Sequence, residues 1–226
     1  MSEAEATVVA LSLKVALTAI VFGIVPAFAA AWLLARGRFR GKSLLQALIT
    51  LPLVLPPVVT GYGLLVLFGT HGPLGSFLES SFGIVFAFRW TGAALAAAVM
   101  AFPLMVRPIQ LSIEAADPGL EDAARTLGAS RIMTFLTVLL PLALPGVTAG
   151  AILAFARAIG EFGATITFVA NIPGQTQTMS LAIYSLLQSP TGDTAAARLI
   201  LFSIVLSVLA IIASEWFARR LQRKRG

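Results

Sequence analysis

Acidic and basic side chains gather in one interval of this chain. Between residues 114 and 131 lie four carboxylates and two guanidinium groups: Glu114, Asp117, Glu121, Asp122, Arg125 and Arg131. Only 12% of all residues are charged and 58% are hydrophobic. Charges grouped in this way can bind a charged protein surface, and Glu121 and Arg125, one helical turn apart, can also pair with each other. The interval is therefore the first candidate for contact with a soluble partner.

The sequence has few residues that could form a metal site, a nucleotide site or a catalytic thiol. The chain has no cysteine and one histidine, His71, which excludes disulfides, thiolate or multi-histidine metal sites and a catalytic thiol. Residues 37–43, GRFRGKS, resemble a phosphate-binding loop but have three residues between the glycines where that loop needs four. They also follow an apolar segment, so we interpret them as a basic connector at a membrane edge. No metal, nucleotide or other cofactor is predicted for this chain.

Long apolar segments must position these residues. A bilayer span needs about 20 apolar residues in a helix, and the charged fraction is about half that of a soluble domain. The chain is therefore predicted to be an all-α integral membrane protein with one domain over residues 1–226. The five predicted spans are residues 8–34, 44–68, 91–113, 142–159 and 195–217.

Two apolar segments need a separate interpretation, residues 8–34 and residues 160–194. Residues 8–34 could be read as a signal peptide, but only Lys14 precedes the apolar core, so we expect a retained span. Residues 160–194 hold two apolar runs that are too short to span, separated by Pro173-Gly174. They are predicted to form partly inserted or interfacial helices.

Arginine and lysine residues predict the orientation of the spans. They cluster in the first connector, around the charged interval and at the C-terminus. The clustered residues are Arg36, Arg38, Arg40, Lys42, Arg107, Arg125, Arg131, Arg219, Arg220, Arg223, Lys224 and Arg225. All lie on the cytoplasmic side if five spans start from a periplasmic N-terminus and end at a cytoplasmic C-terminus. The net charge of +6 is assigned to this anchoring and not to nucleic acid.

Prolines and small residues indicate how the spans are built. Pro26, Pro103 and the pair Pro56-Pro57 are expected to interrupt the first three spans, because proline removes a backbone donor and kinks a helix. A pore-lining break is favoured at the pair. Small residues recur every fourth position in the fourth span, which allows close packing within a dimer or within the chain equally well. They are Gly146, Gly150, Ala154 and Ala158.

The charged interval is predicted to begin with a short helix. Asp117 can cap its start, with Pro118 at the first helical position. Gly128 can adopt the left-handed conformation that ends it. A small, shallow face at helical spacing would let another protein approach closely. That face comprises Leu120, Ala123, Ala124 and Leu127.

A second short helix is predicted to follow directly. Ser130 can cap it, and it is expected to run over residues 131–139. Pro141 is expected to end this helix before the fourth span begins. The result would be a helix-turn-helix on the cytoplasmic face, joined to a transmembrane helix.

This interval resembles the EAA loop of ABC importer permeases. The family pattern is an acid, two small residues, a glycine and a later Leu-Pro. The matching residues are Glu121, Ala123, Ala124, Gly128, Leu140 and Pro141, with Asp122 inserted after the glutamate and Leu127 on the same face. The resemblance implies a type I importer permease fold, in which residues 114–141 form a coupling loop that docks on a separate ATPase subunit.

Two further segments resemble the molybdate permeases. They are residues 51–62, LPLVLPPVVTGY, and residues 156–178, ARAIGEFGATITFVANIPGQTQT. In the related sulfate permeases a Gly-Glu-Tyr-Gly variant is expected, so Phe162 and residues 174–178 favour molybdate, with tungstate beside it. A sulfate permease stays the alternative. A secondary transporter is less favoured, because the sequence has no internal repeat and no buried acid pair.

The resemblance also implies the partners. Two copies of this chain would form the path, and two ATPase subunits would bind ATP and magnesium. A periplasmic molybdate-binding protein would deliver the anion, touching residues 69–90 and 171–194. The chain is then not itself an enzyme, has lipid and no nucleic acid as a partner, and lies in a bacterial inner membrane.

A path for a dianion needs binding that is weak enough for release. Hydroxyl and amide groups suit this better than bare cations, and the candidates are Thr60, Thr165, Thr167 and Asn171. Arg157 and Glu161 lie one helical turn apart, and ionisable groups in membranes are usually functional. Because a carboxylate repels molybdate, we interpret this pair as a gate or a structural ion pair.

Overall fold

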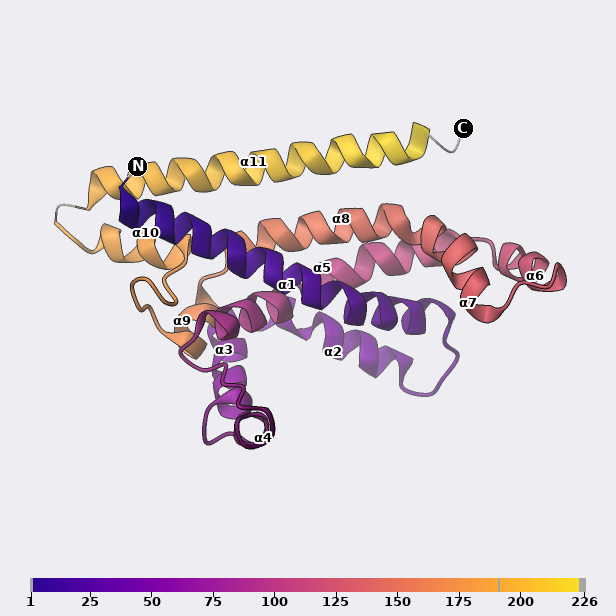
Figure 1. Cartoon of the computed structure of the whole chain (residues 1–226), viewed down its shortest axis with the longest axis horizontal. Coiled ribbons are helices and arrows are strands. Elements are labelled where there is room, and N and C mark those ends of the chain that lie inside the picture. The colour runs from indigo at the N-terminus through magenta and orange to yellow at the C-terminus, as the bar shows by residue number, and fades with distance from the viewer. Residues whose placement is uncertain (1, 191, 224–226) are drawn as a thin grey trace.

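The computed structural model describes residues 2–190 and 192–223, and every regular element within them is a helix. Three helices pack side by side along an elongated bundle: α1 (Glu3–Arg36), α5 (Trp90–Ala115) and α8 (Leu140–Ile159) (Figure 1). α11 (Asp193–Arg223) lies along α8. The other elements are α2 (Lys42–Val54), α3 (Pro57–Phe68), α4 (Pro73–Phe82), α6 (Pro118–Thr126), α7 (Arg131–Thr134), the π-helical turn η1 (Phe135–Leu139), α9 (Gly163–Val169) and α10 (Met179–Leu187).

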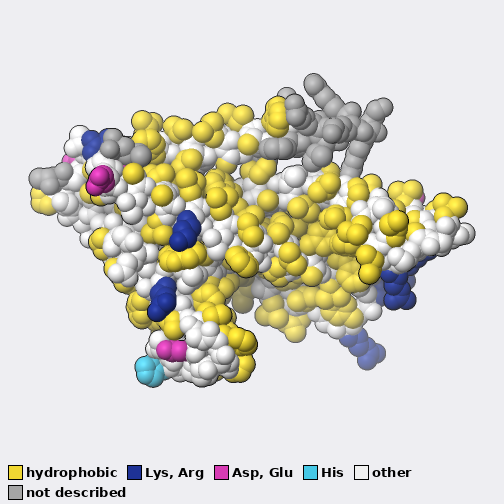
Figure 2. All heavy atoms as spheres, viewed as in Figure 1, with side chains coloured by type: hydrophobic (Ala, Val, Ile, Leu, Met, Phe, Trp, Pro, Cys, Tyr) yellow, Lys and Arg dark blue, Asp and Glu magenta, His cyan; other side chains and the backbone are white. Residues whose placement is uncertain are grey.

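Four helical runs among the described residues are long and apolar enough to cross a membrane, and a bent pair raises the number to five. The predicted spans over 8–34, 91–113, 142–159 and 195–217 lie within α1, α5, α8 and α11. Hydrophobic side chains cover the middle of the face in Figure 2, while Lys and Arg lie toward the two ends of the long axis. An apolar waist with charged ends is what a bilayer requires.

The second predicted span is not one straight helix. α2 and α3 meet at an angle of 114° across a short break. Leu55 and Pro56 there are extended, with ψ angles of 145° and 132°. Proline lacks a donor and pushes the residue before it out of the helical region. The break expected at Pro56-Pro57 within the second predicted span is confirmed.

The other two prolines do not interrupt their helices. α1 continues through Pro26, and α5 continues through Pro103 and also through Pro108. A single proline frees one carbonyl, which neighbouring turns and helices can satisfy, whereas two in succession deprive adjacent turns of their donors. The expected interruptions at Pro26 and Pro103 are therefore wrong.

The small residues of α8 face α5. Gly146, Gly150, Ala154 and Ala158 are all buried within the single chain. A Cβ added at Gly146 would lie 2.4 Å from the carbonyl oxygen of Pro108, and one at Gly150 would lie 2.9 Å from that of Met105. Small residues let helix backbones approach this closely. The stripe is thus a contact between two helices of one chain.

The stretch 160–194 folds as two short helices, as predicted. α9 has seven residues and α10 has nine, and neither is long enough to span. Between them Gly174 has a φ of +74°, a conformation that glycine adopts without strain. α9 packs against α3, and α10 packs against α11 at the end of the bundle where α1 begins (Figure 1).

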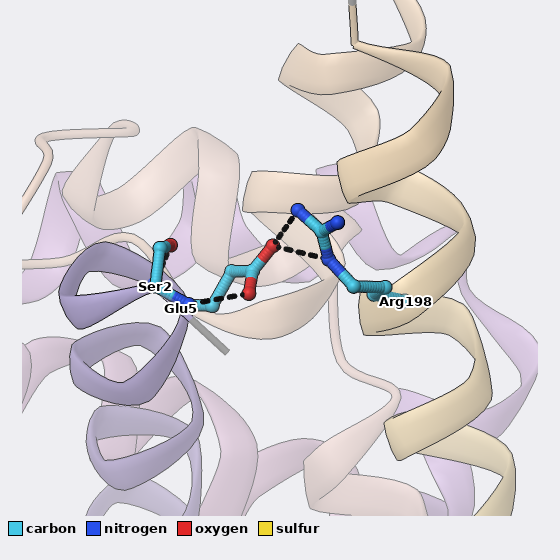
Figure 3. A network of polar contacts seen from close by, with 3 residues as sticks. All are labelled: Ser2, Glu5 and Arg198. Atoms are coloured by element: carbon cyan, nitrogen blue, oxygen red, sulfur yellow. Dashed lines mark hydrogen bonds and ion pairs between the residues drawn. The ribbon is translucent and has the colours of Figure 1, made fainter.

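Polar contacts fasten the beginning of α1 to its neighbours. The buried carboxylate of Glu5 accepts hydrogen bonds from Nε and Nη2 of Arg198 in α11, at 2.9 and 2.7 Å (Figure 3). Ser2 and Glu5 also form a reciprocal cap at the helix start. About two helical turns further on, the Oγ of Ser12 accepts a hydrogen bond from the backbone N–H of Met179 at 2.7 Å. α1 is thereby tied to both α10 and α11.

Candidate functional site

The first helix of the predicted coupling loop, residues 114–141, forms as expected. The Oδ1 of Asp117 accepts a hydrogen bond from the N–H of Gly119 at 2.8 Å, and Pro118 occupies the first turn. The helix ends at Thr126, and Gly128 has a φ of +92°. An acidic cap, an N-terminal proline and a left-handed glycine are local signals for where a helix starts and stops.

Large apolar side chains stand exposed around this turn. Leu127 is 90% exposed, and Leu120 at the other end of α6 is 49% exposed. α7 adds Ile132 and Met133, and η1 adds Leu136. Ala123 is exposed and Ala124 half-buried. α6 and α7 project from one end of the bundle (Figure 1), so this apolar surface has the position and shape to contact another protein.

Glu121 pairs with a residue far away in sequence. Its Oε1 lies 3.1 Å from Nη2 of Arg36, the last residue of α1. The same guanidinium nitrogen donates to the carbonyl oxygen of Ala116 at 2.9 Å. The partner considered from the sequence, Arg125, is exposed and does not make this contact. Sequence reasoning counted Arg36 only as an orientation signal, and the contact spans 85 positions.

The second helix does not end where the sequence predicted. The chain stays helical from Arg131 to Ile159. Ser130 caps the start through Met133 N–H, as expected, but η1 widens the helix just before Pro141. A π-helical turn bonds five residues back, here from Leu140 N–H to Phe135 O. This register shift lets the helix pass Leu140-Pro141 without a stop, so α7 continues through η1 directly into α8.

Arg157 and Glu161 lie at the junction between α8 and α9. Their side chains form an ion pair, with Glu161 2% exposed. The Oε1 of Glu161 also accepts a hydrogen bond from the N–H of Ala164 at 2.8 Å, in the first turn of α9. These contacts favour the structural interpretation of the pair, because one carboxylate joins two helices. The alternative role as a gate stays a prediction.

The candidate path residues lie on α3, on α9 and in the segment after α9. α3 and α9 pack closely, since a Cβ at Gly61 would lie 2.5 Å from the carbonyl oxygen of Ala164. Thr165 is buried, and the hydroxyl of Thr167 donates to its own helix. Asn171 donates to Ser185 in α10 at 2.6 Å. Thr60 is half-buried on α3. Their part in transport stays a prediction.

Comparisons with known proteins agree over nearly the whole chain. A family model described as "Binding-protein-dependent transport system inner membrane component" matches residues 19–223. The molybdenum transport system permease protein ModB of Haemophilus influenzae is 54% identical, over 98% of this chain and 97% of that protein. ModB of Escherichia coli K12 is 54% identical over 100% and 99%. The sulfate transport system permease protein CysT of Salmonella typhimurium is 38% identical over 92% and 76%.

Solved structures share the fold. A bacterial ABC transporter that imports alginate aligns with a TM-score of 0.73 and 16% identity, over 97% of this chain and 80% of that one. The inward-facing MetNI methionine ABC transporter aligns with a TM-score of 0.70 and 17% identity, over 98% and 99%. At such identities these structures show the fold alone. Together with the family model and the two ModB proteins, they show that this chain belongs to the family of binding-protein-dependent transport system inner membrane components.

Proposed function

We propose that this chain is the permease subunit of an ATP-driven importer that moves molybdate, and with it tungstate, across the inner membrane. The observation that supports molybdate as the transported anion is the 54% identity to ModB proteins along nearly their full length. The sulfate permease CysT is less similar and is covered over 76% of its length, so sulfate is the second candidate. The apolar spans and the exposed α6–α7 hairpin support a membrane subunit that is driven by ATP hydrolysis in a separate subunit.

The proposed topology has five spans in one domain over residues 1–226, with α2 and α3 together as the second. The N-terminus would be periplasmic and the C-terminus cytoplasmic. The connector after α1, the α6–α7 hairpin and the end of α11 lie toward the same end of the long axis (Figure 1), which supports this orientation. The C-terminal basic residues Arg219, Arg220, Arg223, Lys224 and Arg225 enter only through the sequence, because their side chains lie outside the described residues.

Docking of an ATPase subunit is proposed at the coupling loop, residues 114–141. Leu120, Leu127 and Ile132 offer apolar side chains that a groove in the partner would bury. Two copies of this chain and two ATPase subunits would form the complex, with ATP and magnesium held by the ATPase. A periplasmic binding protein would deliver the anion at the opposite end, at residues 69–90 and 171–194.

ATP binding would shift the population of the permease between its inward-facing and outward-facing states. ATP favours the closed ATPase dimer, which moves the coupling loops. Because the chain is helical without a stop from α7 through η1 into α8, a displaced loop would move α8 directly. α8 ends at the Arg157–Glu161 junction, next to α9 and the candidate hydroxyls. Hydroxyl groups there would bind the dianion weakly enough for release.

Reconstitution with the ATPase subunit and the binding protein tests the proposal. Molybdate is expected to stimulate ATP hydrolysis, whereas sulfate alone as the stimulating anion would select the second candidate. Gly128→Pro and Glu121→Lys are expected to abolish the stimulation while membrane insertion is retained. Gly128 has a φ of +92° that proline cannot adopt. Glu3→Lys, an exposed charge reversal at the start of α1 and outside both segments proposed for the binding protein, is the matched control. Unchanged stimulation in both loop variants would refute docking at this loop.

A further inference from the structure

The coupling loop is joined to the rest of the bundle in two ways, by the continuous chain into α8 and by contacts with the end of α1. Along the chain, α7 and η1 connect it to α8. Across the fold, Arg36 at the end of α1 reaches both the carbonyl oxygen of Ala116 and the carboxylate of Glu121. One contact lies just before the start of α6 and the other lies in its first turn. A single guanidinium group therefore links the start of α6 to the end of α1.

The setting of this contact makes it stronger than an ordinary surface ion pair. The side chains of Arg36 and Glu121 are 21% and 17% exposed, so solvent screens them only in part. Without Arg36, a largely buried carboxylate and a backbone carbonyl would both lose their donor. The nearby basic residue Arg38 is exposed and offers a matched comparison.

We propose that Arg36 is a positioning residue for coupling: it fixes α6 against the inner end of α1, so that the coupling loop meets the ATPase already oriented. The ATPase part of this inference rests on the proposed function, whereas the part that concerns the permease alone does not. At its other end α1 is also tied to α10 through Ser12. Glu5 ties the same end to α11 through Arg198 (Figure 3). α6 is thereby connected through one 34-residue helix to the opposite end of the bundle.

Hydrogen exchange on the permease without any partner tests the anchoring. In Arg36→Gln, the amides of α6 are expected to exchange about fivefold faster than in the unchanged chain, the effect of losing a partly buried ion pair. Amides in α5 and α8 are expected to keep their rates. Arg38→Gln removes the same charge two residues further along the chain and should leave the exchange rates of α6 unchanged. Equal exchange in the Arg36 and Arg38 variants would overturn the proposal.

A charge swap separates the ion pair from a general effect of the substitution. Arg36→Glu places two carboxylates together and is expected to accelerate exchange in α6 more than Arg36→Gln does. The double variant Arg36→Glu, Glu121→Arg restores opposite charges and should recover most of the protection. Failure of the double variant to recover any protection would overturn a role for this pair.

Titration with the ATPase subunit tests the consequence for docking. A less ordered loop adopts the conformation that binds the ATPase for a smaller fraction of the time, and the apparent dissociation constant rises in inverse proportion to that fraction. In Arg36→Gln, the ATPase concentration for half-maximal stimulation is expected to rise, up to about fivefold, while the stimulated rate at saturation is retained. Absence of stimulation in the unchanged chain would refute the proposed function. Normal stimulation with equal half-saturation in both chains would refute the positioning role alone.

Discussion

Replacing Gly146 with alanine tests whether the small-residue face of α8 packs within the chain. A Cβ there would lie 2.4 Å from the carbonyl oxygen of Pro108 and 2.5 Å from the Oγ of Ser112. Ordinary contacts begin at 3.4 Å, so α8 and α5 must separate by about 1 Å, against backbone that cannot swing aside. Overpacking of this kind lowers the free energy of unfolding by about 1–3 kcal/mol.

Two other glycines provide the scale for this effect. A Cβ at Gly150 would meet the carbonyl oxygen of Met105 at 2.9 Å, a smaller overlap, and one at Gly63 in α3 would meet nothing within 4 Å. Alanine stabilises a helix by about 1 kcal/mol relative to glycine at each position. Subtracting the Gly63→Ala result therefore isolates the packing cost. Stability is expected to fall in the order Gly63→Ala, Gly150→Ala, Gly146→Ala.

The assay is an SDS titration in mixed micelles, followed by circular dichroism, on the monomeric chain. Unfolding free energies for the three variants that agree within about 0.5 kcal/mol, the usual range of neutral surface substitutions, would refute the packing argument. A loss in Gly146→Ala that is seen only in a dimeric sample would assign this face to a contact between subunits instead.

Two further substitutions test the polar junctions in the same assay. Glu161→Gln removes the charge that faces Arg157 and weakens the acceptor for the N–H of Ala164, so the free energy of unfolding should fall by about 1–3 kcal/mol. The control, exposed Glu79→Gln, should change this free energy little. Equal effects of the two substitutions would contradict a stabilising role for the Arg157–Glu161 junction. Ser12→Ala leaves the buried N–H of Met179 without its acceptor, at a cost of about 1–3 kcal/mol. Exposed Ser80→Ala is its control, and no difference between the two would argue against the tie between α1 and α10.

Local signals predicted most of the elements of this fold. Hydropathy is summed over neighbouring residues, so α1, α5, α8 and α11 were predictable from composition along the chain. The start of α6 at Asp117 and the turn at Gly128 were predictable too, because caps and left-handed turns depend on one or two adjacent residues.

Predictions failed where a residue's effect depends on what surrounds it. Pro26 and Pro103 sit inside continuous helices, while Pro56-Pro57 breaks one. Pro141 was expected to stop a helix, and the π-helical turn before it lets the helix continue. The same residue type thus has different outcomes, because neighbouring turns decide whether a freed backbone group is satisfied.

The sequence by itself determined the class of protein, the long apolar helices and the location of the α6–α7 hairpin, because each depends on residues close together in the chain. Only the tertiary structure decided that Glu121 pairs with Arg36 and not Arg125, and that the glycines of α8 pack on α5. Those contacts join residues tens of positions apart. Their geometry follows from how whole helices pack, which no local pattern specifies.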